Sequence, residues 1–193
     1  RDGFIYSTEV FKRCGKYLNT FAVDCYPNPR WIGPGRPAAG TEEPLAFVYK
    51  KGTEAMKKYC KGSEIYVAEF GYFIDYRHIY DSKYCGEQAN RLLRNFLKAK
   101  ALGFAQFYYF LAIGSAGGNE GQYYYFGIWW NASTPLPAVA ALATAGRIVE
   151  NVDRAEEIPL KSDLGSTVYR KTDGRAVGAF WAITSAFTPT LEV

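Results

Sequence analysis

The chain has 193 residues, of which 48% are hydrophobic, 17% aromatic and 22% charged, a composition typical of a packed globular protein. It excludes a disordered, collagenous or coiled-coil chain. The 23 basic and 19 acidic residues give a net charge of +4 without any block of like charge, so we expect no nucleic-acid partner. The sequence has no run of about 18 apolar residues, so we expect no membrane span.

The first half of the chain alternates helical patterns with short apolar runs. Apolar spacing predicts helices over residues 8–17 and 45–59, and β-rich runs predict strands over residues 21–26 and 65–70. Between the first strand and the second helix lies a loop rich in Gly and Pro, residues 30–43. A loop of that length favours a functional role.

The second half continues the alternation before its character changes. One apolar face predicts a helix over residues 86–102, which Gly103 ends. The aromatic run 104–111 predicts a buried strand, and an alanine-rich helix starts near Pro135 and reaches about Glu150. Three strand-then-helix units predict an α/β chain with parallel strands covered by helices.

The pattern after Asn151 is that of antiparallel β-structure. Two β runs, 166–171 and 176–182, flank an Asp-Gly turn at residues 173–174, which is a strong hairpin signal. We therefore expect the chain to pass from an α/β part into an antiparallel β element.

The motif Tyr66-Val67-Ala68-Glu69-Phe70-Gly71 carries a resemblance to a known group of enzymes. It precedes a helix with Glu87-Gln88-Ala89 and Leu92-Leu93-Arg94 and then an aromatic strand. This order resembles the C-terminal half of clan A retaining glycoside hydrolases, most closely the xylosidase-like and iduronidase-like members. Residues 135–145 and the hairpin at 173–177 resemble the last barrel helix and the accessory β-sandwich of those enzymes.

The resemblance covers residues 21–181 and implies a division of the chain. Residues 1–151 would form about three strand-helix units from the C-terminal part of a (β/α)8 barrel. Residues 152–193 would form the start of an accessory β-sandwich. The implied activity is retaining hydrolysis of a glycosidic bond in a carbohydrate substrate, with no cofactor.

The family's nucleophile, at the carboxyl end of barrel strand seven, falls on Glu69. A carboxylate at that end of a barrel strand faces the pocket, which agrees with the role. The competing interpretation is a strand-end carboxylate in a salt bridge. The family's acid/base belongs to an Asn-Glu dipeptide upstream of the nucleophile, but no such dipeptide precedes Glu69. Asn119-Glu120 follows it in a glycine-rich loop, and we interpret that pair as a coincidence.

A complete (β/α)8 barrel needs about 250 residues, more than this chain has. One interpretation is the C-terminal piece of a larger enzyme, completed by a second polypeptide segment. The other is a half-barrel relative that lost catalysis and serves as a carbohydrate-binding or structural extracellular glycoprotein. The start at Arg1 without a leader and the strand-like end at 188–193 favour a fragment. We expect Val23, Val67 and Phe107, or their neighbours, to line the open barrel interior.

Aromatic and acidic residues near the strand ends are candidate contacts for a sugar. Flat rings stack on the apolar faces of sugars, and carboxylates accept hydrogen bonds from hydroxyls. The candidate substrate-binding residues are Tyr26, Tyr72, Trp129 and Trp130, with Trp31 and Phe73 as further aromatics and Asp24 and Asp75 as further acids. We interpret His78 as a loop residue rather than a proton shuttle.

The four cysteines, Cys14, Cys25, Cys60 and Cys85, contain no CxxC pair, and the chain has one histidine, so we expect no metal site. They form either two disulfides or four buried thiols. Barrel geometry favours Cys25 with Cys85 and Cys14 with Cys60 if disulfides exist. An Asn131-Ala132-Ser133 sequon predicts glycosylation of Asn131 and, with disulfides, a secreted protein.

Overall fold

The computed structural model describes residues 3–26, 43–62, 64–75, 78, 80–113, 124–131, 133–158 and 164–182. Trp31 and Asn119-Glu120, which the sequence analysis singled out, lie outside the described residues. Within the described part, no helix is long and apolar enough to cross a bilayer.

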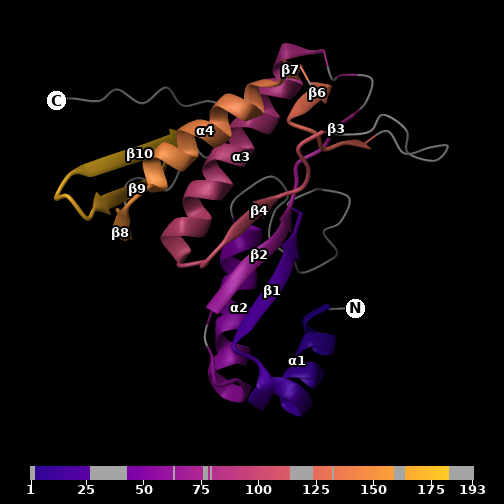
Figure 1. Cartoon of the computed structure of the whole chain (residues 1–193), viewed down its shortest axis with the longest axis vertical. Helices are drawn as coiled ribbons and strands as arrows, with labels where there is room; N and C mark the ends of the chain where they lie inside the picture. The colour runs from indigo at the N-terminus through magenta and orange to yellow at the C-terminus, as the bar shows by residue number, and fades with distance from the viewer. Residues whose placement is uncertain are drawn as a thin grey trace.

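Helices and strands alternate along the first two thirds of the chain (Figure 1). The helices are α1 (Gly3–Cys14), the 3-10 helix η1 (Gly15–Tyr17), α2 (Glu43–Tyr59), α3 (Ser82–Leu102) and α4 (Pro137–Val149). The strands are β1 (Thr20–Cys25), β2 (Glu64–Phe70), β3 (Ile74–Asp75), β4 (Phe107–Tyr109), β5 (Tyr124–Tyr125), β6 (Trp129–Asn131), β7 (Thr134–Pro135), β8 (Val152–Glu157), β9 (Leu164–Lys171) and β10 (Ala176–Ala182).

The strands β1, β2 and β4 form a parallel sheet in that order. Helix α2 connects β1 to β2, and α3 connects β2 to β4, so both connections are crossovers through a helix. The strands β5, β6 and β7 lie between β4 and α4, where β5 pairs with the earlier strand β3, and β6 pairs with β7. The mixed α/β fold is therefore confirmed, with all three carboxyl ends of the parallel strands at one edge.

Some element bounds differ from those predicted by the sequence. Helix α3 begins at Ser82, because the Asp81 side chain accepts a hydrogen bond from the Lys83 backbone N–H at 2.9 Å and caps the helix. Its last residue is Leu102, and Gly103, where φ is 96°, ends the helix as predicted. Strand β4, Phe107–Tyr109, is shorter than the aromatic run, although the backbone N–H groups of Ala105 and Phe110 also donate to β2, at 2.8 and 2.7 Å.

The main core lies between the parallel sheet and the helices. Ile65, Val67 and Phe70 of β2 are buried there together with Leu92 of α3 and Met56 of α2. The expectation was wrong for Val23, Val67 and Phe107 themselves, because all three belong to this helix-facing core, and only its alternative, their neighbours, is left for a barrel interior. The alternating side chains of the same strands face the other way.

Two glycines allow the chain before β1 to approach the chain before β2 closely. A Cβ atom on Gly62 would lie 2.0 Å from the backbone oxygen of Asn19, and one on Gly15 would lie 2.3 Å from that of Tyr59. The Gly62 N–H also donates to the Leu18 oxygen at 3.4 Å. These backbone contacts fix how β1 enters the sheet beside β2.

The antiparallel sheet of β8, β9 and β10 packs on α3 and α4. The hairpin of β9 and β10 around residues 172–175 is the one that the Asp-Gly pattern predicts. Tyr169 is buried and donates to the Leu97 oxygen of α3 at 2.8 Å. The Lys171 ammonium donates to the last carbonyls of α4, including those of Arg147 at 3.0 Å and Ile148 at 2.6 Å. A cation there complements the negative end of the helix dipole.

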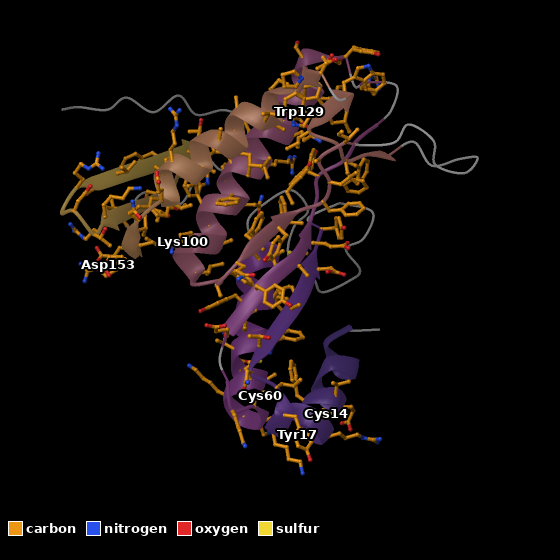
Figure 2. The ribbon with its side chains drawn as sticks, in the orientation of Figure 1. Cys14, Tyr17, Cys60, Lys100, Trp129 and Asp153 are labelled. Atoms are coloured by element: carbon orange, nitrogen blue, oxygen red, sulfur yellow. The ribbon has the colours of Figure 1, made fainter. Side chains whose placement is uncertain are left out.

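The described residues include all four cysteines, and no disulfide joins any two of them. Neither expected pair is formed. Cys25 is buried in the main core, whereas Cys85 is buried in a separate small cluster with Ile74, which explains why these two do not meet. Cys14 and Cys60 both lie at the end of the molecule where α1 and α2 meet (Figure 2).

Candidate active site

An irregularity in β2 decides where the Glu69 side chain points. Val23 of β1 pairs with Val67, but the next residue of β1, Asp24, pairs with Glu69, so Ala68 is an extra residue in β2. Such a bulge reverses the side on which the following side chains lie. Without it, Glu69 would share the face of Val67 and would be buried against the helices.

The burial pattern of β2 agrees with this reading. Ile65, Val67 and Phe70 are buried, while Tyr66, Ala68 and Glu69 are half-buried. Phe70 therefore takes the helix-facing position that Glu69 would otherwise occupy. We call the sheet face opposite the helices the open face, and its residues are Ala22, Asp24, Tyr66, Ala68, Glu69 and Tyr108. Tyr66 and Tyr108 are ring neighbours on it, with centroids 6.3 Å apart.

Glu69 is held by the first residue after β1. The Tyr26 hydroxyl donates a hydrogen bond to Glu69 Oε2 at 2.5 Å. Burial, followed by the bond to Glu69, raises the pKa of Tyr26 above its usual range, so the phenol stays a donor at neutral pH. One carboxylate oxygen of Glu69 is thus fixed in place, and no described residue donates to the other.

Asp24 is the second carboxylate of the open face. It is the register partner of Glu69 on the neighbouring strand, and such strands lie about 4.8 Å apart. The Asp24 side chain is exposed, and partial desolvation, followed by the negative charge of Glu69, raises the pKa of its carboxyl. Among the described side chains, no ion pair involves either carboxylate.

An aromatic cluster supports the Tyr26 ring. Its centroid lies 5.6 Å from that of Phe126 and 6.2 Å from that of Phe110, both in edge-to-face arrangements. Gly71, directly after β2, leaves the room for this packing. A Cβ atom there would lie 2.6 Å from the Phe126 ring and 2.9 Å from the Tyr26 ring.

Gln88 of α3 joins the segments that carry these aromatics. It is fully buried, and its amide nitrogen donates to the Tyr72 oxygen at 3.0 Å and to the Gly127 oxygen and the Tyr109 hydroxyl, each at 3.4 Å. The Tyr109 hydroxyl in turn donates to the Phe126 oxygen at 2.8 Å. The hydrogen bonds of this one side chain thereby connect the end of β4, the segment after β2 and the segment before β6.

The sequence-predicted aromatics divide into two groups. Tyr26 contacts Glu69 directly, and the Tyr72 ring stacks on Phe73 with centroids 6.5 Å apart while Arg91 lies 4.6 Å over it. Trp129 and Trp130 lie on β6, outside this cluster: Trp129 packs against the main core, and Trp130 contacts the Tyr80 ring at 5.0 Å. Figure 2 shows Trp129 far from the end where α1 and α2 meet.

The remaining candidates fall elsewhere. Asn131 ends β6 and pairs with Thr134, while His78 stacks on Tyr84 with ring centroids 4.5 Å apart. Asp75 lies on β3, and its side chain is outside the described residues. No group of three or more potential metal ligands occurs among the residues that the structure describes.

The sequence analysis missed three parts of the site: the bulge at Ala68, the hub role of Gln88 and the support from Phe126. Gln88 belongs to the Glu87-Gln88-Ala89 motif that carries the resemblance, and the aromatic residues around Phe126 stand out in the sequence. Nothing in the local pattern of β2 marks the bulge.

Comparison with known proteins gives one fold relative. A solved structure described as a family 39 glycoside hydrolase from the gut symbiont Bacteroides cellulosilyticus WH2 matches with a TM-score of 0.68 at 19% sequence identity. The match covers 95% of this chain and 37% of that chain. No family model matches the sequence. No curated protein matches it either.

At 19% identity the likeness shows the fold alone. The chain therefore has the fold of part of a glycoside hydrolase, and it spans little more than a third of that relative's length. The resemblance found in the sequence is supported at the level of a glycoside hydrolase fold, without distinction between xylosidase-like and iduronidase-like members.

Proposed function

We propose that this chain is the nucleophile-bearing part of a retaining glycoside hydrolase, with Glu69 as the nucleophile. The observation that carries the proposal is the bulge at Ala68, which directs Glu69 to the open face, beside the carboxyl ends of the parallel strands. Active sites of (β/α)8 enzymes lie at that end, and bulges near them re-aim side chains. The fold relative supports the same class of activity.

In the proposed reaction the Glu69 carboxylate attacks the anomeric carbon of a glycoside and forms a covalent glycosyl-enzyme. A second carboxylic acid protonates the leaving oxygen and then takes a proton from the water that releases the sugar. Tyr26 orients the nucleophile by donating to Oε2, which leaves Oε1 for attack. Tyr26, which contacts Glu69, is a proposed aromatic contact of the sugar, and Tyr72, Trp129 and Trp130 are the other proposed contacts.

The acid/base belongs, in this proposal, to a second polypeptide segment that completes the barrel. Within the described part of the chain, β1 and β4 lie at the edges of the parallel sheet, and such edges favour further strand pairing. The fold relative is also much longer than this chain. Residues 152–193 would then begin an accessory β-sandwich, and the sequon at Asn131 supports an extracellular setting.

The alternative function is a carbohydrate-binding or structural extracellular glycoprotein derived from a glycosidase fold. It is favoured by the absence of an Asn-Glu dipeptide before Glu69 in this sequence. Such a protein would bind sugars on the open face without hydrolysing them.

The anomeric configuration of the product tests the proposal. We expect the full polypeptide that carries this chain to hydrolyse at least one member of a 4-nitrophenyl glycoside panel, with first-formed product of retained configuration by proton NMR. Inversion would contradict the assigned mechanism. Binding of sugars without any turnover would favour the alternative function.

A further inference from the structure

Two carboxylates lie side by side on the open face, and together they disfavour a negatively charged ligand there. Asp24 and Glu69 are register partners across β1 and β2, and the bulge at Ala68 places both on the same face. Glu69 has a single hydrogen-bond donor among the described residues, the neutral Tyr26 hydroxyl. Neither carboxylate has an ion-pair partner within the described part of the chain.

We propose that Asp24 is a specificity-determining residue that selects uncharged sugars over uronic acids and sulfated sugars. The inference rests on the proposed function of the open face and names the class of sugar that it accepts. An Asp24 carboxylate accepts hydrogen bonds from two sugar hydroxyls, which a neutral ring supplies. A carboxylate or sulfate on the sugar would lie within a few ångströms of two negative charges, the exposed Asp24 and the half-buried Glu69.

The electrostatics of the pair agree with this role. Partial desolvation and the charge of Glu69 raise the pKa of Asp24, so the negative charge of Glu69 already acts on the Asp24 carboxyl. A third anion in the same site would be less favourable than an uncharged group of the same shape. Selection of this kind uses repulsion of the wrong ligand as well as attraction of the right one.

Two pairs of ligands separate charge from shape. Methyl β-D-glucuronide and methyl β-D-glucuronamide differ by one charge at nearly equal size, as do the corresponding galacturonide and galacturonamide. We would measure the dissociation constants of all four with the full polypeptide by calorimetry or ligand-observed NMR. We expect at least one amide to bind at least tenfold more tightly than its acid, with the ratio narrowing as salt is raised.

The variant Asp24→Asn removes one charge and keeps the size of the side chain. We expect it to lower the amide-to-acid ratio at least threefold, while Glu64→Gln, the same charge change at the exposed start of β2, leaves the ratio unchanged. Equal affinity for acid and amide, an unchanged ratio in Asp24→Asn, or no binding of any of the four would overturn the proposal. Ligands bound with the expected preference but never hydrolysed would contradict the proposed enzyme instead, and hydrolysis without the preference would contradict only the role of Asp24.

Discussion

Glu69→Gln should lower glycoside hydrolysis by about four orders of magnitude or more, because it removes the nucleophile of a covalent mechanism. The amide keeps the size of the carboxylate and still accepts the hydrogen bond from Tyr26 through its oxygen. The side chain is half-buried on the open face, so the change leaves the main core intact. Hydrolysis of aryl glycosides and thermal unfolding of the full polypeptide measure the two effects separately.

Glu64→Gln is the matched control, because Glu64 lies at the exposed start of the same strand. We expect normal hydrolysis from it. Azide should restore activity to Glu69→Ala by attacking the anomeric carbon in place of the carboxylate, and the product should be a glycosyl azide of inverted configuration. Near-normal hydrolysis by Glu69→Gln would show that Glu69 is not the nucleophile.

Gly62→Ala should destabilise the fold by about 3 kcal/mol or more. The added Cβ would lie 2.0 Å from the oxygen, 2.4 Å from the Cα and 2.5 Å from the carbonyl carbon of Asn19, all backbone atoms that cannot rotate away. Relief of this overlap requires β1 and the loop before β2 to separate, which disturbs the pairing of Thr20 with Glu64. Denaturant unfolding followed by circular dichroism measures the loss.

The control for this variant is Gly146→Ala, in the interior of α4. A Cβ atom there meets nothing within 4 Å, and alanine is the better helix former. We expect it to be neutral or to stabilise the fold by up to about 1 kcal/mol. Equal stability of the Gly62 and Gly146 variants would mean that the contact with Asn19 is not a tight one.

Sequence periodicity predicts the order of the elements well because each has a strong local signal. The apolar run of β2, the long amphipathic face of α3 and the Asp-Gly turn of the last hairpin depend on nearby residues alone. Bounds set by hydrogen bonds are less visible. The start of α3 depends on the Asp81 side chain, and the length of β4 depends on how much of it reaches β2.

The side of the sheet on which an individual side chain lies could not be predicted from local periodicity. Strict alternation through β2 places Glu69 with Val67, and only the pairing of Asp24 with Glu69 shows that Ala68 is an extra residue. Likewise, Val23, Val67 and Phe107 face the helices because those helices cover one side of the sheet, a tertiary fact that apolar character does not specify. Contacts between distant segments, such as Gln88 with Gly127, have no local signal.

Covalent trapping tests the central claim most directly. The full polypeptide would be incubated with 2,4-dinitrophenyl 2-deoxy-2-fluoro-β-D-xyloside and the corresponding glucoside, which slow release of a glycosyl-enzyme, and then digested and analysed by mass spectrometry. The proposal predicts a fluorosugar on the peptide that contains Glu69, with fragmentation placing the added mass on that residue. A label on a different carboxylate, or hydrolysis of aryl glycosides by a protein that neither reagent labels, would contradict it.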